Sequence, residues 1–145
     1  MTSTLQAPVG RDPRPAWRRG VGPATVAAAA AAAVALVGTV DPNQAGHYPT
    51  CPFLAVTGLY CPGCGSLRMV HALAHGDPAT MVARNPLGVV ALVVLAATWL
   101  RWTRRAVTGG VRTRVAPAWL IWTALGVVVA FWVLRNVPAT AWLAP

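Results

Sequence analysis

Three cysteines and three histidines are the residues of this chain best suited to chemistry, and all six lie between Asp41 and Arg84. Two of the cysteines form a Cys-x-x-Cys pair, Cys61-Pro62-Gly63-Cys64, and Cys51 precedes that pair. Cysteines at such spacing form structural disulfides, bind thiophilic metal ions or exchange disulfides with other proteins. The residue types alone leave these three chemistries open.

A structural disulfide is the simplest of them, because pairing two of the three thiols would constrain a loop that has little core of its own. A zinc site is the second alternative, with Cys51, Cys61, Cys64 and His71 as ligands if the segment around Cys51 folds back. Thiol-disulfide exchange by Cys61 and Cys64 is the third, since a helix amino terminus stabilises a thiolate. Free cysteines that serve only as small apolar packing residues are the fourth.

The residues after the Cys-x-x-Cys pair predict a short helix over 64–75, which Gly76 ends, and a second over 78–84. At 100° per residue the first helix places Cys64, Arg68, His71 and His75 on one stripe. Of these, Arg68, His71 and His75 form a polar stripe that we expect to bind lipid or a partner protein. An arginine on a mainly apolar helix needs an anion, and a lipid phosphate or Asp77 would serve.

Composition places the chain in a membrane. Of its 145 residues, 56% are apolar and 10% are charged, which is too little charge for an ordinary soluble domain. The charged residues are twelve arginines and three aspartates, a net charge of +9. These arginines flank apolar stretches, as expected for anionic lipid head groups, and no nucleic-acid partner is expected.

Three apolar stretches, 20–40, 86–103 and 115–134, predict transmembrane helices, since about 20 residues at about 1.5 Å each span a bilayer core of about 30 Å. The second stretch includes Arg101, whose side chain would snorkel outward. A signal peptide is the competing interpretation of the alanine-rich first stretch, but no cleavage site follows it cleanly. The remaining segments are predicted to be a disordered basic tail, an outer loop whose prolines make its first part irregular, an Arg-rich turn and a second tail: 1–19, 41–85, 104–114 and 135–145.

Orientation follows from the distribution of arginines. Nine of the twelve flank the predicted spans on the side of the amino terminus and the 104–114 turn, and three lie on the other side. The positive-inside bias therefore predicts a multi-pass protein of a bacterial inner membrane with a cytoplasmic amino terminus. The cysteine-bearing loop and the carboxyl terminus would then face outward.

Several short motifs together resemble a known family. Cys51-Pro52-Phe53, the Cys-Pro-Gly-Cys-Gly run that ends at Gly65, and Asn85-Pro86-Leu87 are similar to the signature of the domain of unknown function 2752 family, small polytopic bacterial membrane proteins. The resemblance implies membrane topology and carries no activity. Leu67 departs from the threonine that many members have there, so no hydroxyl role transfers to this position.

We therefore expect an all-α integral membrane protein with three transmembrane helices and a short interfacial or re-entrant helix after the cysteine pair. A non-enzymatic role is favoured, because paired carboxylates, a nucleophile with its base and a phosphate-binding loop are all missing from the sequence. The expected role is binding of a membrane protein partner or lipid through the outer loop, with no cofactor. The alternative is a zinc-binding or redox protein that uses Cys61 and Cys64.

Overall fold

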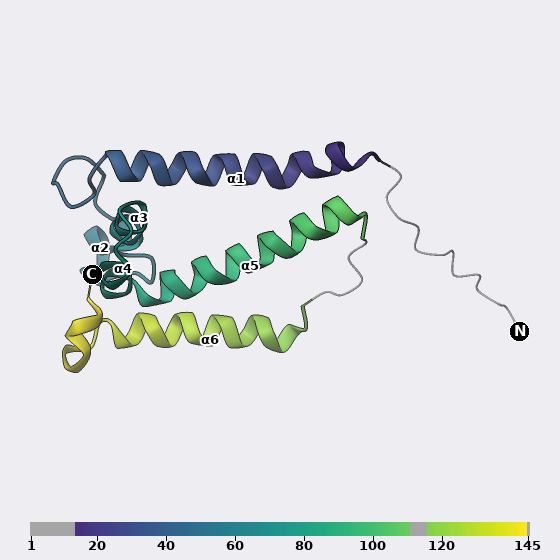
Figure 1. Ribbon diagram of the computed structural model, residues 1–145. Coiled ribbons are helices and arrows are strands. Elements are labelled where there is room, and N and C mark those ends of the chain that lie inside the picture. Colours follow the sequence, from purple (N-terminus) through teal and green to yellow (C-terminus); the bar gives the residue numbers. More distant parts are fainter. Residues whose placement is uncertain (1–13, 111–115, 145) are drawn as a thin grey trace, which may run out of the picture.

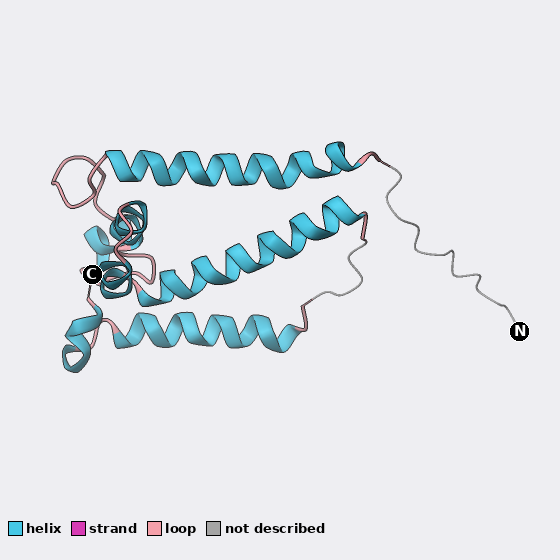
Figure 2. Cartoon of the chain, viewed as in Figure 1, coloured by secondary structure: helices cyan, strands magenta, loops and turns pink. Residues whose placement is uncertain are grey.

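The computed structural model describes residues 14–110 and 116–144, and every regular element within them is a helix. Three long helices extend along roughly the same axis with alternating direction, and the short helices gather at one end of them (Figures 1 and 2). The long helices are α1 (Ala16–Thr39), α5 (Pro86–Thr108) and α6 (Ala118–Leu134). The short ones are α2 (Pro52–Thr57), α3 (Ser66–Ala74), α4 (Pro78–Arg84) and the 3₁₀ helix η1 (Pro138–Leu143).

Helix α1 and helix α5 are long and apolar enough to cross a membrane. In their most apolar stretches only 11% and 0% of the residues are buried within the structure. A core helix of a soluble protein would be mostly buried, so these apolar surfaces suit a lipid environment. The helices therefore suggest a membrane protein.

Helix α6 is shorter than a full crossing, and the predicted third span over 115–134 is not confirmed. Its 17 residues cover about 26 Å, less than the hydrocarbon thickness of about 30 Å. The helix begins only after Pro117, which lies in extended conformation, and residue 115 is outside the described part of the chain.

Several elements differ in extent from the sequence-based expectation. The first long helix starts at Ala16 rather than at residue 20, so the end of the predicted 1–19 tail is helical, while residues 1–13 lie outside the described residues. The second continues past residue 103 to Thr108, because no residue unfavourable to a helix occurs before Gly109, which adopts φ +74°. Helix α3 is shorter than the expected 64–75, since Gly65 has φ +85° and cannot continue a helix.

Prolines begin helices here more often than they prevent them. The segment before Gly58 was expected to be irregular, yet Pro52 occupies the first turn of α2, where a missing N–H costs no hydrogen bond. Pro138 likewise begins η1 in the predicted 135–145 tail. Pro78 and Pro86 open α4 and α5, each after a capping side chain, from Asp77 and Asn85 respectively.

The small core lies where the short helices meet the end of α1, which packs against α3 and α5. Val37 of α1 and Met69 and Ala72 of α3 are buried there. Gly38 permits this approach, because a Cβ at its position would lie 2.9 Å from the Cβ of Ala74. The short helices therefore form a packed cap over the ends of the long ones.

Candidate metal centre

The three cysteine sulfurs converge within this cap. The Sγ of Cys61 lies 3.6 Å from that of Cys51 and 3.0 Å from that of Cys64, and all three sulfurs fall within 4.8 Å of one another. All three are free thiols, so none of the pairings expected for a structural disulfide is present. The segment around Cys51 has folded back onto the pair, which is the condition that the zinc alternative requires.

Local backbone structure aims the thiols at one point. Cys51 is the N-cap of α2, and the backbone of the Cys-x-x-Cys pair forms a turn in which the Cys64 N–H donates to the Cys61 carbonyl at 3.1 Å. The Cys61 N–H in turn donates to the Cys64 sulfur at 3.2 Å. The turn leads through Gly65 into α3, so the two sulfurs stay on its inner side.

Arg135, which follows α6, holds this turn from the far end of the chain. Its side chain is 2% exposed, and its guanidinium donates to the carbonyls of Cys61, Pro62 and Cys64 at 3.0, 3.2 and 3.1 Å. The guanidinium also stacks over the ring of Phe131, 4.9 Å from its centroid. One side chain thus fixes three carbonyls of a four-residue turn.

Asn85 holds the same turn from the start of α5. This side chain is 1% exposed, and its Nδ2 donates to the Pro62 carbonyl at 3.2 Å, the Cys64 carbonyl at 3.4 Å and the Ser66 Oγ at 3.1 Å. Its Oδ1 accepts from the Gly88 N–H at 2.8 Å and so caps α5. The residue serves the helix and the cysteine turn at once.

Asn136 is the third residue that forms hydrogen bonds to this region. Its Nδ2 donates to the carbonyl of Tyr60 at 2.9 Å, and its Oδ1 accepts from the Tyr60 N–H at 2.8 Å. Trp132, one turn earlier in α6, meets the ring of Phe53 edge-on at 5.9 Å. The end of α6 is therefore joined to two residues of the segment between Cys51 and Cys61. We call Asn85, Arg135 and Asn136 the clamp.

Electrostatics distinguish the thiols. Burial, with hydrogen bonding to Cys61, raises the pKa of Cys64 to about 12. The backbone N–H of Leu54, in the first turn of α2, lowers the pKa of Cys51. Burial also lowers the pKa of Arg135, against the attraction of Cys64 and Cys61. An empty site therefore favours a neutral Cys64, and a metal must displace its proton to bind.

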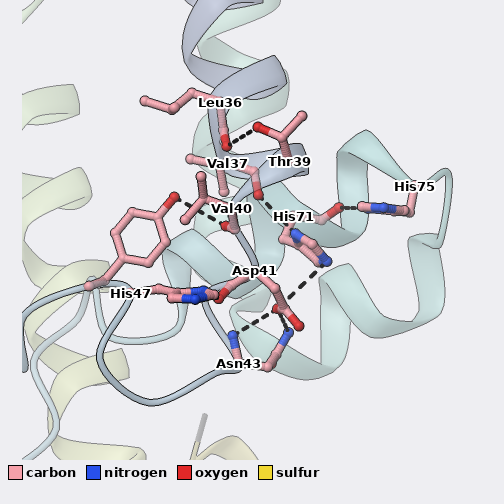
Figure 3. Close-up of polar contacts among 10 residues, drawn as sticks. Leu36, Val37, Thr39, Val40, Asp41, Asn43, His47, His71 and His75 are labelled. Carbon is pink, nitrogen blue, oxygen red and sulfur yellow. Dashed lines mark hydrogen bonds and ion pairs between the residues drawn. The ribbon is translucent and has the colours of Figure 1, made fainter.

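The proposed fourth ligand, His71, faces a different part of the cap. Its Nδ1 bonds to the Val37 carbonyl at 2.8 Å, and its Nε2 lies 3.7 Å from the Asp41 carboxylate (Figure 3). Because a carbonyl only accepts, Nδ1 carries the proton of a neutral ring. His71 ties α3 to the end of α1, and the metal-ligand group in the described residues consists of the three cysteines without it.

The other residues of the predicted polar stripe differ in their contacts, although the rings of His71 and His75 lie 4.3 Å apart between centroids. His75 is exposed, and its Nδ1 bonds to the backbone carbonyl of His71 at 2.8 Å. Arg68 has no hydrogen bond or ion pair to the residues described. Asp77, its expected partner, instead accepts from the Thr80 N–H and hydroxyl at 3.0 and 2.6 Å.

Comparison with known proteins agrees with the motif analysis. Residues 51–99 match the family model described as "Protein of unknown function (DUF2752)". The family resemblance predicted from the sequence is confirmed over these residues. No curated protein and no solved structure matches the chain. The DUF2752 segment contains all three cysteines and Asn85, whereas Arg135 and Asn136 lie beyond it.

The clamp is the part of the site that sequence reasoning missed. Arg135 was counted only among the arginines that set orientation, and Asn85 was noted only as part of the family motif that precedes the second span. Asn136 gave no signal at all. The one available hint was Asn85 beside a proline in the DUF2752 motif, because an N-cap alone would be equally well served by serine or aspartate.

Proposed function

We propose that this DUF2752 protein binds a thiophilic divalent metal ion, with zinc as the best fit, through Cys51, Cys61 and Cys64. The observation that carries the proposal is the convergence of three sulfurs within 4.8 Å of one another. A tetrahedral zinc with ligands at about 2.3 Å separates its sulfurs by about 3.8 Å, so small side-chain adjustments suffice. Among the described residues, the hydrogen bonds of the sulfurs are to one another and to backbone N–H groups.

Charge supports a divalent ion. Three thiolates and Zn²⁺ carry a net charge of −1, and the Arg135 guanidinium that grips the same turn supplies +1. A neutral assembly is the least costly one to bury. With His71 engaged at α1, three protein ligands leave a fourth position for an exchangeable ligand, the pattern of zinc sites that act rather than only support a fold.

The proposed setting is the outer face of a bacterial inner membrane. The two helices long enough to cross, together with α6 and its flanking residues, would form three spans with a cytoplasmic amino terminus, as the arginine distribution favours. The cap would then sit at the outer head-group region. Binding of a partner protein or lipid through Arg68 and His75 stays a prediction.

Elemental analysis of the full chain tests the proposal. The protein is purified in detergent under reducing conditions, loaded with zinc and dialysed. We expect about one zinc per chain in the wild type. Cys61→Ser should lose zinc binding, because Cys61 carries the central sulfur. His71→Ala should retain zinc binding. Zinc well below one per chain, or unaffected by Cys61→Ser, would reject the proposal.

A separate preparation of the full chain, purified without reductant and stripped of metal with a chelator, addresses the redox alternative. Maleimide labelling before and after reduction counts free thiols. Three labelled thiols without reductant agree with the metal site. Two thiols that label only after reduction would support disulfide chemistry at Cys61 and its neighbours in place of zinc.

A further inference from the structure

Arg135 is a buried cation that no carboxylate of the described residues balances. Within residues 14–110 and 116–144, Asp41 is engaged by Asn43 and faces His71, and Asp77 caps α4. Among the described residues the guanidinium donates to backbone carbonyls alone and stacks over the Phe131 ring, and its buried Nε–H finds no acceptor. Burying an arginine in this way is costly, and a nearby anion would remove much of the cost.

In the part of the chain that the structure describes, the groups near Arg135 that can become anionic are the thiols of Cys61 and Cys64 and the phenol of Tyr60. Of these, the thiols lose their protons when a metal binds. The anion that would balance the guanidinium is therefore the filled metal site itself.

We infer that Arg135 is a specificity-determining residue, which selects among thiophilic metals by the net charge of the filled site. The inference rests on the proposed function. With three thiolates as ligands, the filled site has a net charge of −2 with Cu⁺, −1 with Zn²⁺ and 0 with arsenic(III). Arsenite binds the three thiols with release of three waters. Attraction of the filled site to the guanidinium grows with its negative charge, so Arg135 favours binding of Cu⁺ most and of arsenic(III) least.

If Arg135 only positioned the cysteine turn, its removal would affect the three ions differently from the loss of a charge. Since the empty protein is the common reference for all three ions, any loss of turn geometry weakens their binding to a similar extent. A charge effect instead ranks the losses. The ranking therefore separates the two roles without knowledge of the empty state.

The experiment measures the affinities of the full chain in detergent for Cu⁺, Zn²⁺ and arsenite, by competition with chelators or dithiols, in wild type and Arg135→Gln. We expect Arg135→Gln to weaken Cu⁺ most and arsenite least, with about a tenfold step for each unit of charge. Arg135→Lys keeps the charge and should keep the wild-type ratios between the ions. Asn85→Ala removes contacts to the same turn without a change of charge, and should weaken all three ions alike.

Equal losses for the three ions in Arg135→Gln would overturn the inference and leave the proposed metal site standing. Wild-type protein that binds none of the three ions would overturn both. If Arg135→Gln does not fold, Asn136→Asp tests the same point, because it places a negative charge beside the turn and still accepts from Tyr60. Asn136→Asp should also weaken Cu⁺ binding most and arsenite binding least. Equal losses for the three ions in this variant count against the inference.

Discussion

Truncation of Asn85 to alanine should lower the free energy of unfolding more than truncation of an exposed asparagine. The side chain is 1% exposed and makes four hydrogen bonds, one to the Gly88 N–H and three to the cysteine turn and Ser66. Asn85→Ala removes all four and leaves a small polar void. The variant therefore tests whether the clamp holds the cap together.

The magnitude follows from these bonds. Loss of the N-cap costs about 1 kcal/mol. The bond to Ser66 Oγ adds about 1 kcal/mol. The Pro62 and Cys64 carbonyls keep their Arg135 donors, so their two lost contacts together add about 1 kcal/mol rather than the full cost of an unsatisfied buried group. We expect the free energy of unfolding to fall by about 3 kcal/mol.

Reversible unfolding in mixed detergent micelles, followed by far-ultraviolet circular dichroism, measures this change. Asn43→Ala is the matched control, because Asn43 is exposed and its loss should change the free energy by less than about 0.5 kcal/mol. Asn85→Ser retains a capping oxygen and should recover about 1 kcal/mol of the loss. If Asn85→Ala unfolds like wild type, the clamp does not stabilise the cap and the reasoning is wrong.

Two further outcomes are expected. Gly38→Ala should destabilise by about 1–3 kcal/mol in the same assay, because the new methyl group meets Ala74 at 2.9 Å, whereas Gly20→Ala in the same helix meets nothing within 4 Å and should not. Bonds from the Thr80 hydroxyl and N–H lower the pKa of Asp77 below its usual 3.8, so its stabilising effect is full above pH 3.8 and is lost as pH falls through the lowered pKa. Asp77→Asn should remove that part of the acid dependence in an unfolding series between pH 6 and pH 2, and an unchanged acid limb would contradict it.

What could be predicted from the sequence was local. The Cys-x-x-Cys pair, the helix after it and the family motifs are short-range patterns, and they led to the all-helical class and to the three thiols. Even the return of Cys51 had a local cause, since Pro52 begins a helix whose first turn carries that thiol back to the pair.

What was missed involves partners far apart in the chain. The stripe periodicity placed His71 in line with Cys64, but a stripe fixes only the face of one helix and not what packs against it. The actual partner of His71, the Val37 carbonyl, is 34 residues away, and Arg135 reaches the cysteine turn over more than 70 residues. Charge counting treated Arg135 as a surface anchor, because nothing local distinguishes a snorkelling arginine from a buried one.

The clamp residues form hydrogen bonds with the backbone of the cysteine turn, which leaves its sulfurs available to a metal ion. Arg135, Asn85 and Asn136 all bond to main-chain groups of residues 60–64. The sulfurs instead receive backbone N–H groups from their own segment, that of Cys61 at Cys64 and that of Leu54 at Cys51. A turn held by its carbonyls keeps its shape whether or not a metal is bound, so the thiols are preorganised and little ordering cost remains at binding. Because two of the three clamp residues follow α6, the position of that helix and the geometry of the thiols are coupled through the same hydrogen bonds.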